Sequence, residues 1–311
     1  MYKVVLFYKY TRINDPEALK TTQKALLAQL NMKGRMIIAH EGINATFEGT
    51  NEAIAEYISQ MKADSRFADI HWKISDGTEK GTALPRLSVK VRKEIVSLHL
   101  IDGANGEKDD IDPNNLTGTH LKPEELRSWY EAGKEFYIVD MRNDYELKSG
   151  KFENTIFPGM ENFRDLREKV QEIAGLKNKT VLTVCTGGVR CEKASGYLKR
   201  EGFENVFQLD GGIVTYMEKY PGKDFLGSLY VFDKRLTMHF EEPSKHRVIG
   251  LCEKCGISSE HYVNCANLNC HKHFICCEGC LDGTEINKES GGEAYCDDNC
   301  RTIWNNRVLK N

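Results

Sequence analysis

Short apolar runs and helical stripes alternate through the first hundred residues. Residues 4–10 predict a strand, and Asp15-Pro16-Glu17 predicts the start of a helix, with Asp15 as the N-cap and Pro16 in the first turn. The apolar stripe of this helix, at helical spacing, consists of Ala18, Leu19, Ala25, Leu26 and Leu30. A strand followed by an amphipathic helix is therefore expected at the beginning of the fold.

The same alternation continues to about residue 100. A second strand region is predicted at 36–47, with an interruption at 40–42, and further strands at 70–74 and 87–98. Between them, a second helix is marked by Ile54, Tyr57, Ile58 and Met61. The order strand, helix, strand, helix, strand, strand predicts a small sheet with helices on one face, which is a ferredoxin-like (acylphosphatase-like) α+β sandwich over residues 1–100.

The pattern changes after a predicted linker. Residues 101–118 are rich in Asp, Asn and Gly and include a Pro, as is typical of a linker. Apolar runs at 136–142, 180–184 and 206–209 predict buried strands, and residues 192–201, closed by Gly202, predict a helix. We expect an α/β domain over residues 119–225, followed by a connecting segment and a Cys-rich tail over 226–311.

Length, charge and cysteine content narrow the protein class. A chain of 311 residues is long enough for two or three domains, and its formal net charge of −3 gives no general attraction to nucleic acid or membranes. No apolar run approaches membrane-spanning length, and the first apolar run meets Lys9 too early for a signal peptide. Eleven cysteines without an export signal predict a reducing, cytoplasmic setting, in which clustered cysteines usually bind metal.

The segment Cys185-Thr186-Gly187-Gly188-Val189-Arg190 carries the most specific chemical signal. A cysteine at the end of a strand, followed by a glycine turn and a helix start, forms a cradle for a thiolate, because loop N–H groups and the positive end of the helix favour negative charge. Arg190 adds a cation, so we expect a lowered pKa for Cys185 and a nucleophilic sulfur. The alternative, a structural cysteine beside a surface arginine, leaves the two glycines unexplained.

Spacing and flanking segments indicate a fold family. Four residues separate Cys185 from Arg190, one fewer than in cysteine-dependent phosphatases, and the tighter ring suits a single sulfur atom. With the flanking segments 136–150 and 206–213, the loop resembles a rhodanese domain, a sulfurtransferase fold whose cysteine carries a persulfide. The resemblance spans about residues 119–221. It departs at 151–153, where the family usually has Gly-His-Ile, and at Tyr216, where tryptophan is common.

Two stretches of the first hundred residues could bind a substrate such as RNA. In residues 87–93 polar and apolar positions alternate, so one strand face presents Lys90 and Arg92, with Lys93 nearby, and a basic face can bind RNA phosphates. An ordinary solvated strand face is the alternative. His40 lies in a polar loop that could line a site, and the alternative is a hydrogen-bonded structural histidine.

The tail carries a metal-binding pattern. Nine of the eleven cysteines lie between Cys252 and Cys300. Eight of them form four close pairs, which are Cys252 with Cys255, Cys265 with Cys270, Cys277 with Cys280, and Cys296 with Cys300. Eight thiolates suffice for two structural zinc ions of four ligands each. The ninth is Cys276, and possible substitute ligands are His261, His271 and His273.

The sequence leaves the pairing of these cysteines around a metal open. Disulfides or a metal-free segment are the alternatives. So small a segment, with few large apolar residues, would fold poorly without a cross-link, which favours metal.

At full length, the chain resembles the rhodanese-family tRNA uridine hydroxylases. The resemblance rests on residues 34–44, the strand 89–94, the loop 185–191 and the Cys-rich tail, and it covers nearly the whole chain. It implies an oxidoreductase that uses O2 to convert the wobble uridine of tRNA anticodons to 5-hydroxyuridine. It also implies that Cys185 is the active-site cysteine, a persulfide carrier by analogy with rhodaneses, and that Cys191 is its companion.

The residues themselves suggest one chemical route. There is no Gly-x-Gly-x-x-Gly after a strand and no convincing His-x-Asp/Glu with a distant His, so no organic cofactor or non-haem iron site is evident. Thiolate addition of Cys185 to uracil C6 would make C5 able to attack an electrophilic oxygen species. Cys191 could then form or resolve a disulfide or persulfide, while Arg190 holds the developing charge.

Three classes of function remain: a tRNA hydroxylase, a persulfide sulfurtransferase with a protein or RNA acceptor, and a zinc-bearing binding module. The loop by itself favours sulfur transfer, whereas the full-length resemblance favours hydroxylation. The expected catalytic residues are Cys185, Arg190 and Cys191. The expected substrate-binding residues are Thr186, Gly187, Gly188, Val189, His40, Lys90, Arg92 and Lys93.

Overall fold

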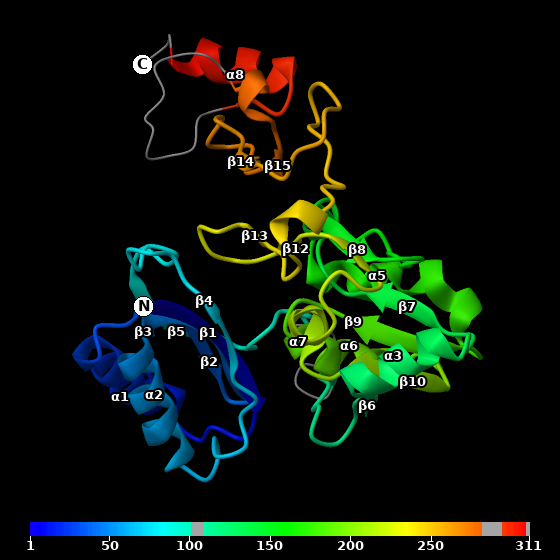
Figure 1. Ribbon diagram of the computed structural model, residues 1–311. Coiled ribbons are helices and arrows are strands. Elements are labelled where there is room, and N and C mark those ends of the chain that lie inside the picture. Colours follow the sequence, from blue (N-terminus) through cyan, green and yellow to red (C-terminus); the bar gives the residue numbers. More distant parts are fainter. Residues whose placement is uncertain (101–108, 282–293, 309–311) are drawn as a thin grey trace. The chain divides into compact units, whose positions relative to one another are not determined.

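The computed structural model describes residues 1–100, 109–281 and 294–308, so part of the predicted linker 101–118 lies outside the described residues (Figure 1). The chain divides into two compact units. The first unit consists of residues 1–143, 154–220 and 232–235, and the second of residues 144–153, 221–231 and 236–311. We keep the predicted four-part division as a working proposal.

The first hundred residues form a sheet with two helices on one face (Figure 1). The elements are β1 (Tyr2–Tyr10), α1 (Pro16–Gln29), β2 (Lys33–Ala39), β3 (Gly42–Thr50), α2 (Asn51–Lys62), β4 (Lys73–Asp76) and β5 (Leu87–Val91). The strand order is β4-β1-β3-β2-β5, with β5 parallel to β2 and the other pairs antiparallel. The predicted ferredoxin-like sandwich is confirmed, with β5 added at one edge.

Local signals explain the helix start and the interruption in the second strand region. The Asp15 side chain accepts a 2.9 Å hydrogen bond from the Ala18 N–H, so α1 begins at Pro16 as predicted. The interruption is a tight hairpin between β2 and β3. Gly42, at a φ of 148°, begins β3, and a Cβ there would lie 2.0 Å from the Lys9 carbonyl oxygen. Only glycine fits this close approach.

Two strand boundaries differ from the prediction. β5 ends at Val91 rather than at residue 98, because the Glu94 carboxylate accepts hydrogen bonds from the Leu98 and His99 N–H groups and turns the chain. β4 begins at Lys73 rather than at residue 70, since the Ile70 N–H bonds to the Phe67 carbonyl in a turn. Both stretches contain apolar residues, and an apolar pattern does not reveal local turns.

A second sheet in the first unit has the parallel topology expected of an α/β domain. Its strands are β6 (Thr119–Leu121), β7 (Tyr137–Asp140), β9 (Thr180–Val184) and β10 (Asn205–Leu209), in the order β6-β10-β9-β7. Its helical segments are α3 (Pro123–Glu131), η2 (Phe163–Asp165), α5 (Leu166–Lys169), η3 (Val170–Leu176), α6 (Val189–Arg200) and α7 (Gly212–Lys219). The predicted strands are confirmed. Helix α6 begins three residues earlier than predicted, which places Arg190 and Cys191 in its first turn.

The chain before β6 packs against this α/β domain. Leu98, Leu100 and Ile111 belong to its hydrophobic core. The Gly118 N–H donates a 2.7 Å hydrogen bond to the Ser195 hydroxyl of α6. The described part of the predicted linker is therefore an ordered contribution to the core.

The second unit contains short strands and the Cys-rich tail. Its elements are α4 (Asp144–Leu147), β8 (Gly150–Phe152), β11 (Phe225–Gly227), β12 (Leu229–Tyr230), β13 (Thr237–Met238), η4 (Pro243–Lys245), β14 (Tyr262–Asn264), β15 (His273–Ile275), η5 (Glu278–Cys280) and α8 (Asp298–Val308). The strands form antiparallel pairs, β8 with β11, β12 with β13, and β14 with β15. Within the described ranges, no helix is long and apolar enough to cross a membrane.

Candidate active site

The loop between β9 and α6 surrounds the Cys185 sulfur with backbone donors. The Gly188 N–H donates to Cys185 Sγ at 3.2 Å, and Gly188 is the N-cap of α6 with a φ of 100°. This left-handed conformation favours glycine. The N–H groups of Ile213 and Val214 bond to the carbonyls of Cys185 and Thr186 at 2.9 and 3.1 Å, so the start of α7 supports the loop from behind.

A second glycine turn allows that support. Gly212 has a φ of 72°, and a Cβ there would lie 2.6 Å from the Gly188 nitrogen and 2.8 Å from the Cys185 carbonyl oxygen. Any side chain at this position would push into the loop. This contact explains why a glycine, Gly212, begins α7.

The surroundings of Cys185 favour its thiolate. The side chain is fully buried, and burial raises the pKa of its thiol. Hydrogen bonding from Cys191, the charge of Arg190 and the backbone N–H groups of residues 190 and 191 outweigh burial and lower this pKa to about 6. Arg190 is itself buried and donates to the Thr186 hydroxyl at 3.2 Å. Backbone N–H groups and the Arg190 cation thus lie around the Cys185 sulfur.

Cys191, in contrast to Cys185, favours its protonated form. Burial, followed by its hydrogen bond to Cys185 and the charge of that sulfur, raises the pKa of Cys191 well above its ordinary value. Cys185 therefore takes the negative charge and Cys191 keeps its proton as a hydrogen-bond donor. The two sulfurs form a thiolate–thiol pair, with Cys185 directly after β9 and Cys191 in the first turn of α6.

Strand β1 contributes side chains that the sequence analysis missed. The Tyr8 hydroxyl donates a 3.0 Å hydrogen bond to Glu192, and the Tyr10 hydroxyl donates to the Val189 carbonyl at 3.3 Å. A Cβ on Gly187 would lie 2.7 Å from Leu6 Cδ2. The signal was available, because residues 4–8 are apolar or aromatic without alternation, as is typical of a strand covered on both faces.

Glu192, in the first turn of α6, is hydrogen-bonded to residues of strands β1, β6 and β10. Besides Tyr8, its carboxylate accepts from Gln208 at 2.9 Å and contacts His120 Nε2 at 3.0 Å. Burial raises the pKa of Glu192, but these hydrogen bonds and the His120 charge lower it overall. Hydrogen bonding to Glu192 raises the pKa of His120. This network fixes the first turn of α6, where Arg190 lies.

Lys73 is a further residue that sequence reasoning missed. It begins β4 and is buried, and its Nζ lies 5.0 Å from the centre of the Tyr8 ring. A single lysine in a short strand gives no sequence signal of this position.

Some predicted substrate-binding residues lie in the Cys185 loop, and the others lie in the N-terminal sheet and its turns. Thr186 to Val189 form the loop itself. His40 Nδ1 bonds to the Ile13 carbonyl at 2.8 Å, which matches the structural alternative for this histidine. Lys90, Arg92 and Lys93 are exposed at the end of β5.

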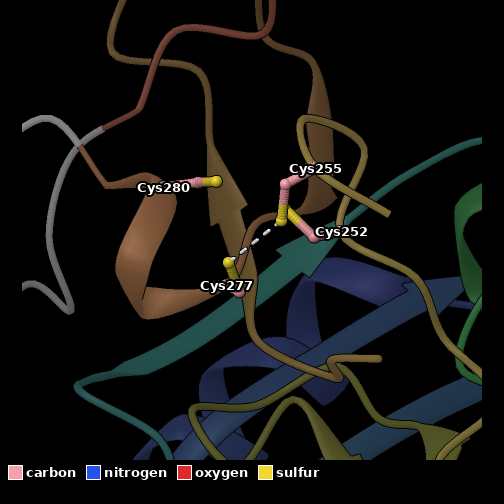
Figure 2. Close-up of side chains that lie close together, drawn as sticks. All are labelled: Cys252, Cys255, Cys277 and Cys280. Carbon is pink, nitrogen blue, oxygen red and sulfur yellow. Dashed lines mark hydrogen bonds between the residues drawn. The ribbon is translucent and has the colours of Figure 1, made fainter. Parts of the chain in front are cut away.

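The tail brings its cysteines together in two groups of four. One group is Cys252, Cys255, Cys277 and Cys280, and the other is Cys265, Cys270, Cys296 and Cys300. In Figure 2 the four sulfurs of the first group point toward one another. Each group combines two of the predicted pairs that are not neighbours in sequence, so the pairs interleave. The structure thus resolves the pairing that the sequence left open.

The spacing within the groups fits zinc. A tetrahedron with Zn–S bonds of about 2.3 Å has edges of about 3.8 Å. The sulfurs of Cys255 and Cys277 are 3.6 Å apart, those of Cys270 and Cys296 3.6 Å, and those of Cys265 and Cys300 3.4 Å. All eleven cysteines are free of disulfides. The donor sets therefore suit two structural zinc ions.

Three family models match successive parts of the chain. They are described as UPF0176 acylphosphatase like domain, matching residues 2–95, Rhodanese-like domain, matching residues 122–219, and Rhodanase C-terminal, matching residues 226–301. A protein from Bacillus pumilus named tRNA uridine(34) hydroxylase is 40% identical over 312 residues, covering 99% of this chain and 91% of its own. A protein of the same name from Bacillus licheniformis is 43% identical over 282 residues, covering 89% of this chain and 84% of its own.

The chain belongs to the tRNA uridine(34) hydroxylase family. A rhodanese-related protein of known structure from Thermoplasma volcanium is 24% identical, with a TM-score of 0.28, and the match covers 33% of this chain and 93% of that protein. The fold of this family member, an acylphosphatase-like domain followed by a rhodanese-like domain, follows from the family models and from the order of strands in its two main sheets.

Four other candidate metal ligands in the tail lie outside both cysteine groups. They are Cys276, His261, His271 and His273. Burial raises the pKa of Cys276 to about 11, and its carbonyl contacts His261 Nδ1 at 2.8 Å. His273 contacts the Tyr230 hydroxyl at 3.1 Å. His271 belongs to neither four-ligand group.

A third group, His239, Glu241 and His246, was overlooked in the sequence. Their ligand atoms lie within 4.8 Å of one another. However, His246 Nδ1 lies 2.7 Å from a Glu241 carboxylate oxygen and its Nε2 3.2 Å from Glu260. Burial lowers the pKa of His246, but these carboxylates raise it overall. The two carboxylates therefore favour the protonated form of the His246 ring, and a protonated ring has no lone pair for a metal.

Proposed function

We propose that this protein hydroxylates uridine 34 of tRNA, the wobble position, to 5-hydroxyuridine with O2 as the oxygen source. Its family membership and the name of its full-length relatives support this substrate and reaction. The structural observation that carries the proposal is the buried Cys185 thiolate at the start of α6, with Arg190 beside it. A thiolate of pKa about 6 is a ready nucleophile at neutral pH.

In the proposed reaction, Cys185 Sγ adds to C6 of the uracil ring. The electron pair of the C5–C6 double bond moves toward C5 and O4, and Arg190 stabilises the resulting enolate charge. C5 then attacks O2, and protonation gives a hydroperoxide on C5. Loss of the C5 proton and departure of the Cys185 sulfur restore the double bond and return Cys185 to its thiolate form.

The cysteine pair can balance this reaction. One oxygen atom of O2 enters the base and the other leaves as water, which requires two electrons and two protons. The freed Cys185 thiolate attacks the outer oxygen of the hydroperoxide, which leaves the hydroxyl group on C5, and Cys191 then displaces water from the oxidised Cys185 sulfur to form a disulfide. The pair thus supplies the two electrons, Cys191 supplies one proton and solvent the other, and their mutual hydrogen bond places the two sulfurs in contact. A cellular thiol reductant then restores the pair. Cys191 is thus proposed as the companion of Cys185.

Other residues would hold the substrate. The backbone of residues 186–189 surrounds the sulfur and would contact the base. The exposed basic residues Lys90, Arg92 and Lys93 would bind phosphates of the anticodon arm, and His40 would contribute from the β2–β3 turn. We place the protein in the cytoplasm because its proposed substrate is tRNA.

Each four-cysteine group of the tail is proposed to hold one zinc ion. When bound, zinc supplies a structural cross-link and takes no part in the hydroxylation. The interleaved ligand pairs would then join segments that are up to 35 residues apart, as for Cys265 and Cys300.

The test is mass spectrometry of nucleosides from unmodified tRNA incubated with the protein in air and, in parallel, without oxygen. We expect uridine 34 to gain one oxygen atom in air only, and Cys185→Ser to abolish the gain. Replacement of oxygen by sulfur on the base, or unchanged RNA with sulfur transfer to cyanide, would instead establish the sulfurtransferase alternative through a Cys185 persulfide. Hydroxylation by Cys185→Ser at the wild-type rate would contradict both reactions.

A further inference from the structure

A buried lysine of the N-terminal sheet lies against Tyr8, whose hydroxyl approaches the Cys185 loop. Lys73 pairs with Leu6 of β1, and only 6% of its surface is exposed. Its Nζ lies 5.0 Å from the centre of the Tyr8 ring. The Tyr8 hydroxyl lies close to Gly188, because a Cβ built on that glycine would be 2.9 Å from the hydroxyl oxygen. The Gly188 N–H donates a hydrogen bond to the Cys185 sulfur. Tyr8 therefore joins the Lys73 ammonium to the turn that holds the thiolate.

The Lys73 ammonium has no hydrogen-bond acceptor or ion-pair partner among residues 1–100, 109–281 and 294–308, and it makes a cation–π contact with the Tyr8 ring. A second buried lysine shows the contrast. Lys193 Nζ contacts carboxylates of Glu41, Glu94 and Asp110 at 2.7 to 2.9 Å. Burying an ammonium without such partners is costly. Negative charge nearby offsets part of this cost, and the Cys185 sulfur is among the charges that act on the Lys73 ammonium.

We propose that Lys73 is a positioning residue of the Cys185 site, whose ammonium stabilises negative charge on the Cys185 sulfur. The proposal rests on the proposed function only in taking Cys185 as the nucleophile. It makes the N-terminal sheet part of the reactive site, since β4 and β1 supply Lys73 and Tyr8.

The charged groups around Lys73 are consistent with this role. Burial lowers its pKa to about 8, against the opposing charges of Asp210, Cys185 and Glu192. On the same side lies His71, whose pKa is lowered by burial and then by the Lys73 charge. Lys73 is thus mostly protonated at pH 7, where the Cys185 thiol is mostly ionised. Facing the sulfur itself are Arg190, Cys191 and Tyr8.

The test measures the ionisation of Cys185 directly. The protein is alkylated with iodoacetamide for short times between pH 4.5 and 9, digested with trypsin, and the modified fraction of each cysteine peptide is measured by mass spectrometry. Trypsin cleaves after Arg190, so Cys185 and Cys191 are found on separate peptides. The midpoint of the pH profile is the readout, because a change in access alters the rate equally at every pH.

We expect a wild-type midpoint near pH 6 and a rise of about one pH unit in Lys73→Met, the loss of one unit charge acting at several ångströms. Lys73→Arg, which keeps the cation, should retain most of the low midpoint. Lys24→Met, the same change at an exposed position of α1, is the matched control and should leave the midpoint at the wild-type value. An unchanged midpoint in Lys73→Met overturns the proposal.

Thermal unfolding separates this role from a structural one. Because an unpaired buried charge opposes folding, Lys73→Met should be at least as stable as the wild type. A lower melting temperature together with an unmoved midpoint would make Lys73 a structural residue instead. The assay uses neither tRNA nor O2, so a protein that fails to hydroxylate tRNA contradicts the proposed function and leaves this inference standing.

Discussion

The hydroxyl of Tyr8 donates a 3.0 Å hydrogen bond to the carboxylate of Glu192, 184 residues further along the chain. Tyr8 lies on the face of β1 opposite to the helices α1 and α2, and Glu192 lies in the first turns of α6, two residues after Arg190. Two domains that fold from separate stretches of sequence thus share a hydrogen-bond network directly behind the Cys185 loop.

Removing this hydroxyl should weaken the joint between the domains. We expect Tyr8→Phe to lower the free energy of unfolding by about 1.5 kcal/mol, since a buried hydrogen bond to a charged group is lost while the ring remains. Tyr10→Phe is the control on the same strand face, and its longer 3.3 Å bond to a neutral carbonyl should cost less, about 0.5 kcal/mol. Urea unfolding measures both, and equal losses would contradict the special importance of Glu192.

Lys193 should be indispensable for stability, in contrast to Lys73. Its ammonium, with a fully buried side chain, is shared by Glu41, Glu94 and Asp110. Lys193→Met would leave these carboxylates without their cation, and breaking a buried ion pair from one side costs about 3–5 kcal/mol. The same Lys→Met change at position 73 removes a charge that has no such partners. Urea unfolding that ranks Lys73→Met as the more destabilised variant would refute this comparison.

His246 should make the second unit sensitive to pH. Its pKa is raised above the ordinary value because Glu241 and Glu260 outweigh burial, so the folded state binds the proton more tightly than the unfolded state. The stabilisation is therefore complete below the unfolded pKa of about 6.5 and is lost as the pH rises through the folded value. Melting temperatures measured from pH 6 to 9 should fall more steeply for the wild type than for His246→Gln. Parallel curves would exclude this contribution.

Metal content tests the two cysteine groups. Elemental analysis of protein purified without chelator should give two zinc ions per chain. Cys255→Ser should lose about one ion, and prolonged treatment with a strong chelator should unfold the tail. Cys276→Ala is the matched control, because Cys276 is adjacent to Cys277 but belongs to neither group. His246→Gln should also retain two ions. A loss of zinc in either control would show that the ligand sets are wrong.

The sequence by itself determined the features that depend on neighbouring residues. Cys185, the glycines and Arg190 stand within six positions, so the sequence displays the residue types of the thiolate loop together, and the Gly188 N–H reaches the Cys185 sulfur within this stretch. The cap at Asp15, the strand at 180–184 and the order of elements in the N-terminal sheet follow for the same reason. Local hydrogen bonds and hydrophobic periodicity act over a few residues, and the sequence displays them directly.

Tertiary structure alone decided which distant residues meet. The interleaved cysteine groups, the buried pairing of Lys193 and the approach of Tyr8 and Lys73 to the loop all join positions far apart in the chain. The close spacing within each of the four cysteine pairs allows several combinations of pairs, and only the path of the chain between them selects one. A lysine in a strand is likewise ambiguous, because burial depends on what packs over it. These contacts arise when whole surfaces come together, and no short stretch of sequence records that event.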